Sequence, residues 1–425
     1  MESYSFLFDL AIIILTTKAL GIISNKFHMP QVVGALLAGL VFGPACIGVI
    51  QNNDFIEITA ELGVVVLMFS TGMETDIKEL KESGKSSFFI ALCGVLVPLI
   101  GGFLVAQYFN QPDRIPSDAS STLFLQNLFI GVILTATSVS ITVETLKELG
   151  RLKTRSGNAI LGAAIIDDIL GIVALTVITS FTDSSVNIVF VLLKILAFFL
   201  FAAVAGVCFY KLYSWWSELA HRELHRHVVF AFAFCLLMAY CAEELFGVAD
   251  ITGAFIAGLV LSGTKKSHYI AAKFDVLSYL YLSPIFFASI GLKVALPEMT
   301  GTIVAFSLVL VVVAVLTKIV GCGVGAKICG LETYESQRVG VGMVSRGEVA
   351  LIVASKGAAL GLLGSDFIGP IVIMVVITTV ITPILLKIVY KKDPDMISTI
   401  DDDGFAKNYE IQERLRQFSQ THSKI

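Results

Sequence analysis

Charge is what this sequence has little of. Its 425 residues include 30 Lys and Arg and 34 Asp and Glu, so only 15% carry a formal charge, whereas soluble globular chains carry about 25%. Hydrophobic residues make up 56% of the chain. This composition excludes a secreted disulfide scaffold, a disordered chain and a nucleic-acid binder, and it predicts a chain embedded in lipid.

Cysteine motifs and a leader peptide are also missing. The seven cysteines form no Cys-x-x-Cys pair and have no His at a spacing typical of metal ligands, which indicates packing residues. The first apolar run starts at Phe6 without a basic region or cleavage motif, so we interpret it as a retained helix. No cofactor is expected, and no metal beyond a transported cation.

Long apolar runs are what the sequence has in abundance. A membrane-spanning helix needs about 20 mostly apolar residues, and the chain contains thirteen such runs, of which the ninth is short. They lie at about 6–24, 30–50, 57–73, 86–109, 122–143, 156–181, 187–210, 227–246, 249–263, 276–295, 301–325, 338–361 and 366–389. We therefore predict an all-α polytopic membrane protein with a transmembrane domain over 1–389. A polar tail over 390–425 follows, in which 408–417 has the pattern of a short amphipathic helix.

The distribution of Lys and Arg predicts the orientation. Sixteen of these residues lie in the odd-numbered loops between the spans, and two, Arg114 and Lys293, lie in the even-numbered loops. Positive charge accumulates on the cytoplasmic side of membrane proteins. The sequence thus predicts cytoplasmic odd-numbered loops, an N-terminus outside and a C-terminus inside.

An internal repeat relates the second span to the ninth. Residues 34–41 and 253–260 share six of eight amino acids at an offset of 219, and the same offset carries Gly72 onto Gly291. The third span therefore matches the tenth. A step of seven spans reverses the direction through the membrane, so the two halves form an inverted repeat.

The repeat divides the membrane domain into six spans, one linker span and six spans. Repeat one covers about 1–182, the linker helix about 187–210 and repeat two about 227–389. Inverted repeats are typical of secondary transporters, which place the substrate site near mid-membrane on broken helices.

The fifth and twelfth spans are the candidates for such broken helices, because polar residues interrupt both near their middle. The candidate residues of the crossing are Thr135, Thr137 and Ser138 in the fifth span, and Ser345, Arg346 and Glu348 in the twelfth. Unwound backbone there would offer carbonyl and hydroxyl oxygens to a cation, and the half-helix ends would supply partial charges.

Five ionisable residues lie deep in predicted spans: Asp167, Asp168, Lys318, Arg346 and Glu348. Each costs several kcal/mol at mid-bilayer unless it is paired or hydrated. Their formal charges sum to −1, and one surplus carboxylate is what a site for H⁺ or a monovalent cation requires. For Arg346 and Glu348, a purely structural role that neutralises the helix crossing is equally open.

The two adjacent aspartates have different surroundings, because neighbours on a helix point about 100° apart. One can line a water-filled cavity while the other pairs across helices, and Lys318 is the natural partner for that second one. Adjacent carboxylates also repel each other, so at least one of them should hold its proton more tightly. A carboxylate that titrates near physiological pH can exchange H⁺ for a cation.

Four segments together resemble the second family of monovalent cation:proton antiporters, of the two-aspartate type. They are 165–171 with the aspartate pair, 135–142 and 345–352 with the crossing motifs, and 284–292. The resemblance covers about residues 5–390. It implies a core domain that moves against a dimerisation domain, and homodimers.

The resemblance also implies site roles. Asp168 would be the carboxylate that binds cation and proton, Asp167 would pair with Lys318, and Thr137 and Ser138 would form the unwound segment beside them. The chain departs from the glutathione-gated potassium efflux members, because it has Asp-Asp in place of Gln-Asp and only about 35 residues after the last span. We therefore expect no gating by a nucleotide-binding domain in the same chain.

The sequence thus favours an antiporter, not an enzyme, in the membrane of a prokaryotic cell. It would exchange Na⁺, K⁺ or Li⁺ for H⁺ by alternating access, with small cations, protons and the lipid bilayer as its partners. The alternative is a potassium efflux channel or K⁺/H⁺ transporter on the same scaffold. The paired acids oppose a third possibility, a symporter for an organic anion.

His221, His225 and His227 lie in the seventh predicted loop among charged residues. They could form a pH sensor, because His titrates near pH 6.5, or they could be part of a solvated charged loop.

Overall fold

The computed structural model describes residues 5–26, 30–51, 53–75, 77–115, 117–179, 181, 188–219, 224–264, 266–293 and 300–391, with side chains except at 5, 79, 215–219, 224, 225 and 348. Residues 1–389 form one compact unit. Within the described ranges every regular element is a helix, and nine helices are long and apolar enough to cross a membrane. Four shorter apolar helices bring the total to the thirteen predicted spans. The amphipathic segment expected at 408–417 lies outside the described residues.

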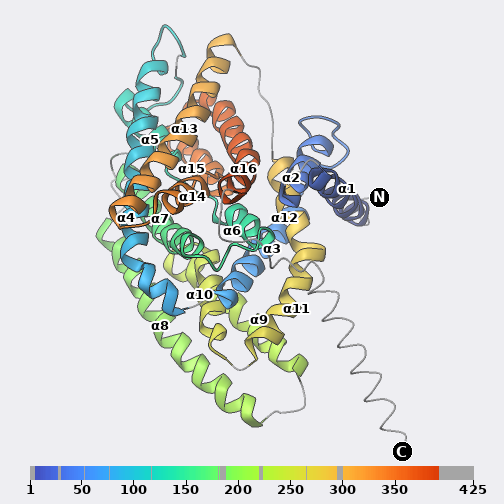
Figure 1. Cartoon of the computed structure of the whole chain (residues 1–425). Helices are drawn as coiled ribbons and strands as arrows, with labels where there is room; N and C mark the ends of the chain where they lie inside the picture. Colours follow the sequence, from blue (N-terminus) through green and yellow to red (C-terminus); the bar gives the residue numbers. More distant parts are fainter. Residues whose placement is uncertain are drawn as a thin grey trace, which may run out of the picture. The chain divides into compact units, whose positions relative to one another are not determined.

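The helices are labelled in Figure 1. Those of the first half are α1 (Ser5–Lys26), α2 (Gln31–Phe42), α3 (Asp54–Glu74), α4 (Ile77–Phe109), α5 (Leu123–Ile133), α6 (Val139–Glu148) and α7 (Arg155–Thr179). Then follow α8 (Ile188–Leu219), α9 (Leu224–Tyr240) with a π-helical turn (Cys241–Leu245), α10 (Asp250–Ser262), α11 (Ser267–Leu277), a second π-helical turn (Ser278–Leu282) and α12 (Ser283–Leu292). The last are α13 (Gly301–Ile328), α14 (Thr333–Gly342), α15 (Glu348–Ala359), a 3₁₀ turn (Ser365–Phe367) and α16 (Ile368–Lys391).

The second span is shorter than predicted, because it ends at Phe42 and not near 50. Gly43 has extended backbone at φ −80° and ψ −177°, and Pro44 follows it. A residue before proline is pushed out of helical conformation by the proline ring. The apolar run continues past this point, but the helix does not.

Helix starts follow local capping rules where the loops are polar. Asn53 accepts a hydrogen bond from the backbone N–H of Ile56 at 2.9 Å at the start of α3. Thr122 and Thr300 cap α5 and α13 in the same way. These side chains satisfy one of the backbone donors that a helix leaves open at its first turn.

Glycine packing shows the two repeats in equivalent contacts. A Cβ on Gly258 of α10 would overlap the carbonyl of Phe69 in α3, and a Cβ on Gly39 of α2 would overlap the carbonyl of Ala288 in α12. Gly258 lies 219 positions after Gly39, and Ala288 lies 219 positions after Phe69, so the two contacts join equivalent positions of the repeat. The same close helix crossing is therefore built twice, once from each repeat.

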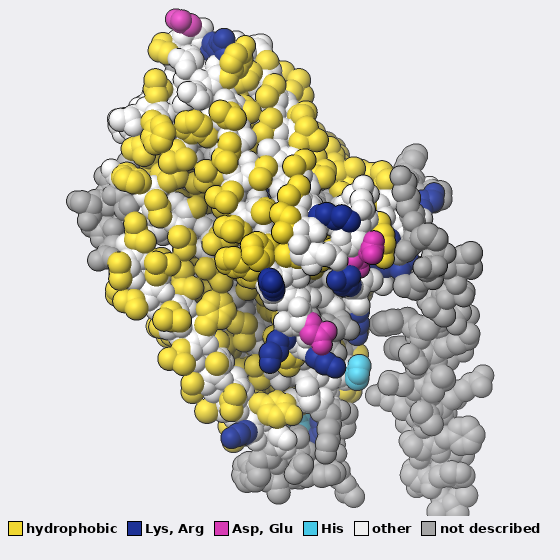
Figure 2. Space-filling view, turned by 60° about the vertical axis from the view of Figure 1, so that its left-hand side comes forward, with side chains coloured by type: hydrophobic (Ala, Val, Ile, Leu, Met, Phe, Trp, Pro, Cys, Tyr) yellow, Lys and Arg dark blue, Asp and Glu magenta, His cyan; other side chains and the backbone are white. Residues whose placement is uncertain are grey.

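Helices of the two halves interleave in Figure 1, where blue and orange or yellow ribbons lie beside each other. α4 packs on α13 and α7, and α13 packs on α14. A second group is formed by α1, α2, α3, α10 and α12, in which α3 contacts α10 and α2 contacts α12. The short helix α6 contacts both α2 and α3 of this second group as well as α7. The face drawn in Figure 2 is broadly hydrophobic, as a lipid-facing surface must be.

Candidate functional site

The fifth and twelfth predicted spans are both broken, and the breaks meet. α5 ends at Ile133 and α6 begins at Val139, while α14 ends at Gly342 and α15 begins at Glu348. The N–H of Ser138 donates to the carbonyl of Ser345 at 2.9 Å, and the Ser345 hydroxyl donates to the carbonyl of Ser138 at 2.6 Å. The unwound segments therefore satisfy part of their backbone against each other, as irregular backbone inside a membrane must.

Further hydroxyl groups form hydrogen bonds at the crossing. Thr142 of α6 donates to the carbonyl of Gly342 at 2.6 Å and lies 3.0 Å from the Ser345 hydroxyl. Thr135 donates to the carbonyl of Val132 at 2.7 Å, at the end of α5. Thr142 was not among the site residues that the sequence singled out, although it lies in the same run of hydroxyl residues.

Arg346 is fully buried and holds backbone carbonyls. Its guanidinium donates to Leu134 at 2.7 Å, where α5 ends, and to Met343 and Val344 at 3.3 and 2.9 Å, where α14 ends. The carboxyl end of a helix carries a partial negative charge of about half an electron. One arginine thus faces the negative ends of both half-helices. The side chain of Glu348, which the sequence placed with Arg346, lies outside what the structure describes.

Asp167 and Lys318 form a buried ion pair beside the crossing. The Lys318 ammonium lies 3.0 and 3.1 Å from the two carboxylate oxygens of Asp167, and the Thr137 hydroxyl donates to Asp167 at 2.6 Å. Lys318 is 0% and Asp167 3% exposed. Gly94 of α4 lies beside the pair, where a Cβ would be in ordinary contact with the ammonium and the carboxylate at 3.6 and 3.7 Å but would overlap the Cys322 sulfur of α13 at 2.5 Å. The sequence alone does not show that Gly94 lies beside this ion pair.

Asp168 lies on a different side of α7 from Asp167. It is half-buried and lines a cavity of about 20 Å³. The walls are Met68 of α3, Val139 of α6, Leu161 and Ile165 of α7, and Ile251, Thr252 and Phe255 of α10. A cavity needs about 10–15 Å³ to hold one water, so there is room for a single water or a small ion. The space lies where the crossing helix α6 meets α3 and α10.

Of the three histidines of the seventh predicted loop, His227 is the one whose side chain the structure describes. His227 belongs to α9 and is fully buried, with its Nε2 2.5 Å from the Lys266 ammonium and its ring against Tyr213. It is therefore not part of a solvated loop, because α9 begins earlier than the predicted span. His221 and the side chain of His225 lie outside the described residues.

A charged cluster connects α6 to the second helix group. The sequence did not single it out. Lys147 lies 2.9 Å from Glu74 of α3 and 3.7 Å from Asp275 of α11. The next residue, Glu148, accepts the N–H of Gln31 at the start of α2. Lys147 was counted among the loop cations, but these contacts lie between helices.

Comparison with known proteins gives consistent matches over most of the chain. The family model described as "Sodium/hydrogen exchanger, transmembrane" matches residues 11–392. The chain is 39% identical to the Na(+)/H(+)-K(+) antiporter GerN of Bacillus cereus over 90% of this chain and 96% of that protein. It is 35% identical to the Na(+)/H(+) antiporter of Enterococcus hirae over 91% and 98%.

Among solved structures, the sodium proton antiporter MjNhaP1 from Methanocaldococcus jannaschii has the same fold, with a TM-score of 0.67. It is 19% identical, and the match covers 92% of this chain and 99% of that one.

Proposed function

Because the chain belongs to the sodium/hydrogen exchanger family, it is a secondary antiporter of monovalent cations and protons, and we propose that Asp168 is the carboxylate at which they exchange. It is an integral membrane protein and a transporter, not an enzyme. Na⁺ is the cation we propose first, since the relatives from Bacillus cereus and Enterococcus hirae are named Na⁺/H⁺ antiporters.

One observation carries the assignment: of the two adjacent aspartates, Asp168 is the one that lines a cavity. Asp167 uses both oxygens on Lys318 and one also on Thr137. Arg346 donates from its two terminal nitrogens to carbonyls where the broken helices end. A cation or a proton at Asp168 would neutralise the surplus negative charge of the site.

We propose alternating access as the mechanism. When a proton leaves Asp168, a cation takes its place, and either species lowers the cost of moving this carboxylate through an apolar surrounding. The site lies between the crossing on one side and α3 and α10 on the other. Movement of the crossing helices against this group would open it to one membrane face and then the other. The contacts of Lys147 and Glu148 would have to break during that movement.

The alternative is transport of K⁺ on the same scaffold. It is supported by the relative GerN, whose name includes K⁺. A channel would need no exchanging carboxylate, and its cation flux would be independent of the pH gradient.

We further propose the orientation that the loop cations indicate, with the N-terminus outside and the C-terminus in the cytoplasm of a prokaryotic cell. A homodimer is the assembly we propose, on the family resemblance.

The test is proton flux in proteoliposomes that hold a pH gradient. We expect Na⁺ to dissipate the gradient through the unaltered protein and not through Asp168→Asn. Asp9→Asn is the matched control, because Asp9 is a membrane carboxylate of α1 whose oxygen contacts Asn53 at 3.3 Å. Cation-dependent flux that is undiminished in Asp168→Asn would overturn the assignment. Comparing Na⁺, K⁺ and Li⁺ in the same vesicles decides the cation.

A further inference from the structure

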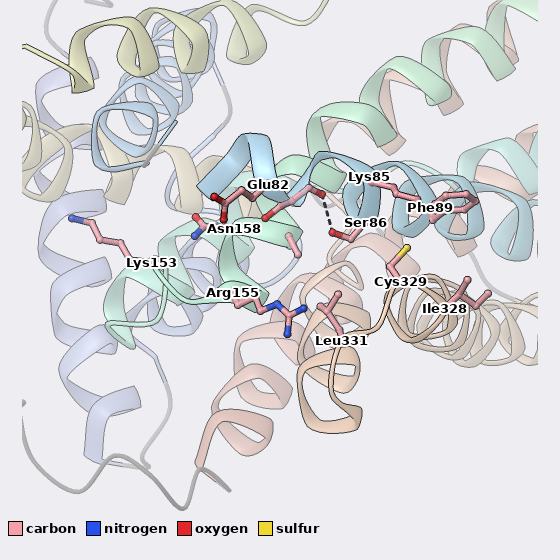
Figure 3. A pocket seen from close by; sticks show the side chains of 12 residues that line it. Glu82, Lys85, Ser86, Phe89, Lys153, Arg155, Asn158, Ile328, Cys329 and Leu331 are labelled. Atoms are coloured by element: carbon pink, nitrogen blue, oxygen red, sulfur yellow. Dashed lines mark hydrogen bonds between the residues drawn. The ribbon is translucent and has the colours of Figure 1, made fainter. Parts of the chain in front are cut away.

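A second cavity lies away from Asp168, at the ends of α4, α7 and α13 that carry the basic loops. Its volume is about 740 Å³, and α4, the start of α7 and the end of α13 form its walls. Figure 3 shows the side chains that line it, among them Arg155, Leu331 and Glu82, with the hydrogen bond from the Ser86 hydroxyl to the Ser83 carbonyl dashed. Volumes of about 300–1,000 Å³ are typical of sites for small organic ligands.

Positive charge dominates this cavity. Lys85, Lys153 and Arg155 line it, against one carboxylate, Glu82. Arg155 lies 3.2 Å from Glu335, but its side chain remains 61% exposed. Among the described residues, Lys85 and Lys153 form no ion pair. The cavity therefore presents cationic groups to a ligand that carries negative charge.

One wall of the cavity is apolar and continues into the lipid-facing surface. Phe89, Ile328 and Leu331 contribute to the lining. Ile328 is 68% exposed, and Val324, one turn earlier on α13, is 49% exposed. Figure 2 shows basic side chains gathered beside a broad hydrophobic face. A ligand held here would contact cations at one end and membrane-exposed hydrocarbon side chains at the other.

Along the membrane normal, the cavity lies at the level of the lipid headgroup layer. α13 has 28 residues, which at 1.5 Å per residue span about 42 Å, more than the hydrocarbon layer of about 30 Å. The last turn of α13, which holds Ile328, therefore lies at the level of lipid headgroups. On the proposed orientation this is the cytoplasmic leaflet, where anionic lipids meet basic pockets between membrane helices.

We propose that this cavity binds the phosphate headgroup of an anionic phospholipid of the cytoplasmic leaflet. Lys85, Lys153 and Arg155 would hold the phosphate, and an acyl chain would run along Ile328 and Val324. The polar amide of Asn158 lies in the same lining. This site adds a lipid partner to the exchanger and does not depend on which cation is transported.

The test measures lipid binding to the purified full chain by native mass spectrometry in detergent. Phosphatidylglycerol is the probe, and phosphatidylcholine is the neutral comparison. We expect the triple variant Lys85→Gln, Lys153→Gln, Arg155→Gln to bind phosphatidylglycerol about a hundredfold more weakly, because each of the three basic residues near the surface contributes about fivefold. The control variant replaces Lys26, Lys211 and Lys273 by Gln; these exposed cations lie on other helices.

Three outcomes would overturn the proposal. One is phosphatidylglycerol affinity in the triple variant equal to that of the control variant. Another is equal binding of phosphatidylcholine and phosphatidylglycerol. The third is displacement of phosphatidylglycerol by millimolar inorganic phosphate or ATP, which would assign the cavity to a soluble anion.

If the triple variant melts below the control, Lys153→Glu alone replaces it, since one exposed side chain does not affect folding. Binding is measured without transport, so failure here leaves the exchange assignment untouched.

Discussion

Arg346 shows how a single buried charge serves the backbone. A bare guanidinium in a membrane interior costs several kcal/mol, yet here it donates to three carbonyls that two ended helices leave open. From the sequence alone, Arg346 could be structural or part of the ion site. The contacts support a structural role in the crossing, where it balances the negative ends of α5 and α14.

Replacing Arg346 tests this role. We expect Arg346→Gln to lose about 2–4 kcal/mol of stability, because buried carbonyls lose charged donors, and to lose most cation-dependent proton flux. Arg346→Lys should retain part of both, since one ammonium reaches fewer carbonyls than a guanidinium. Thermal unfolding in detergent measures the first effect and proteoliposome flux the second. A melting temperature equal to that of the unaltered protein in Arg346→Gln would contradict the assignment.

Asp167 and Lys318 form a second test at this scale. Removing one partner of a buried ion pair typically costs about 3–5 kcal/mol, because the other charge stays buried without compensation. We therefore expect Lys318→Gln to unfold at a clearly lower temperature. The double variant Lys318→Gln, Asp167→Asn should recover most of that loss, since both charges are gone. A double variant no more stable than Lys318→Gln would refute the pairing argument.

At the scale of elements, close crossings between helices of opposite repeats define the second helix group. α10 approaches α3 at Gly258, and α2 approaches α12 at Gly39, through backbone contacts that exclude a side chain. Both glycines belong to the repeated segments 34–41 and 253–260. The repeated segments therefore reflect a packing requirement that is the same in both halves.

Adding a methyl group at these crossings should separate the helices. We expect Gly258→Ala and Gly39→Ala each to cost about 1–3 kcal/mol, as overpacking in a tight interface does, and to do so to a similar degree. Gly84→Ala in α4 is the control, because nothing lies within 4 Å of a Cβ there; it should leave stability unchanged or slightly raised. Thermal unfolding of the three variants measures these changes in stability. A Gly258→Ala protein with the same melting temperature as the control would contradict the packing argument.

For the whole molecule, exchange at one carboxylate makes transport depend on pH in a defined direction. Protons and Na⁺ compete for Asp168, so the apparent KM for Na⁺ should rise as pH falls. Once the carboxyl is mostly protonated, the rise approaches about tenfold per pH unit by mass action. Initial rates in proteoliposomes over a series of pH values measure this. An apparent KM that does not change with pH would exclude competition at one site.

Much of this protein was predictable from sequence because lipid imposes simple rules. Thirteen apolar runs, the repeat and the polar interruptions at 135–142 and 345–348 predicted an all-helical inverted-repeat transporter with two broken helices, and the fold confirms it. The segment 43–50 was wrongly included in a helix, because apolar composition does not report backbone conformation. The interhelical contacts of Lys147 escaped prediction, because a loop count does not tell which cations meet carboxylates of other helices.

The sequence by itself determined the class of protein, the number of spans and the pair of intramembrane aspartates, because the cost of charge and of unpaired backbone in hydrocarbon restricts the solutions. The residues alone left open which aspartate meets Lys318 and which lines a cavity; the family resemblance implied one assignment, and the tertiary structure decided it. Adjacent residues on α7 point to different neighbours, and those neighbours come from α3, α10 and α13, far away along the chain. The scarce charges of the chain thus acquire their separate surroundings only when the two repeats pack together.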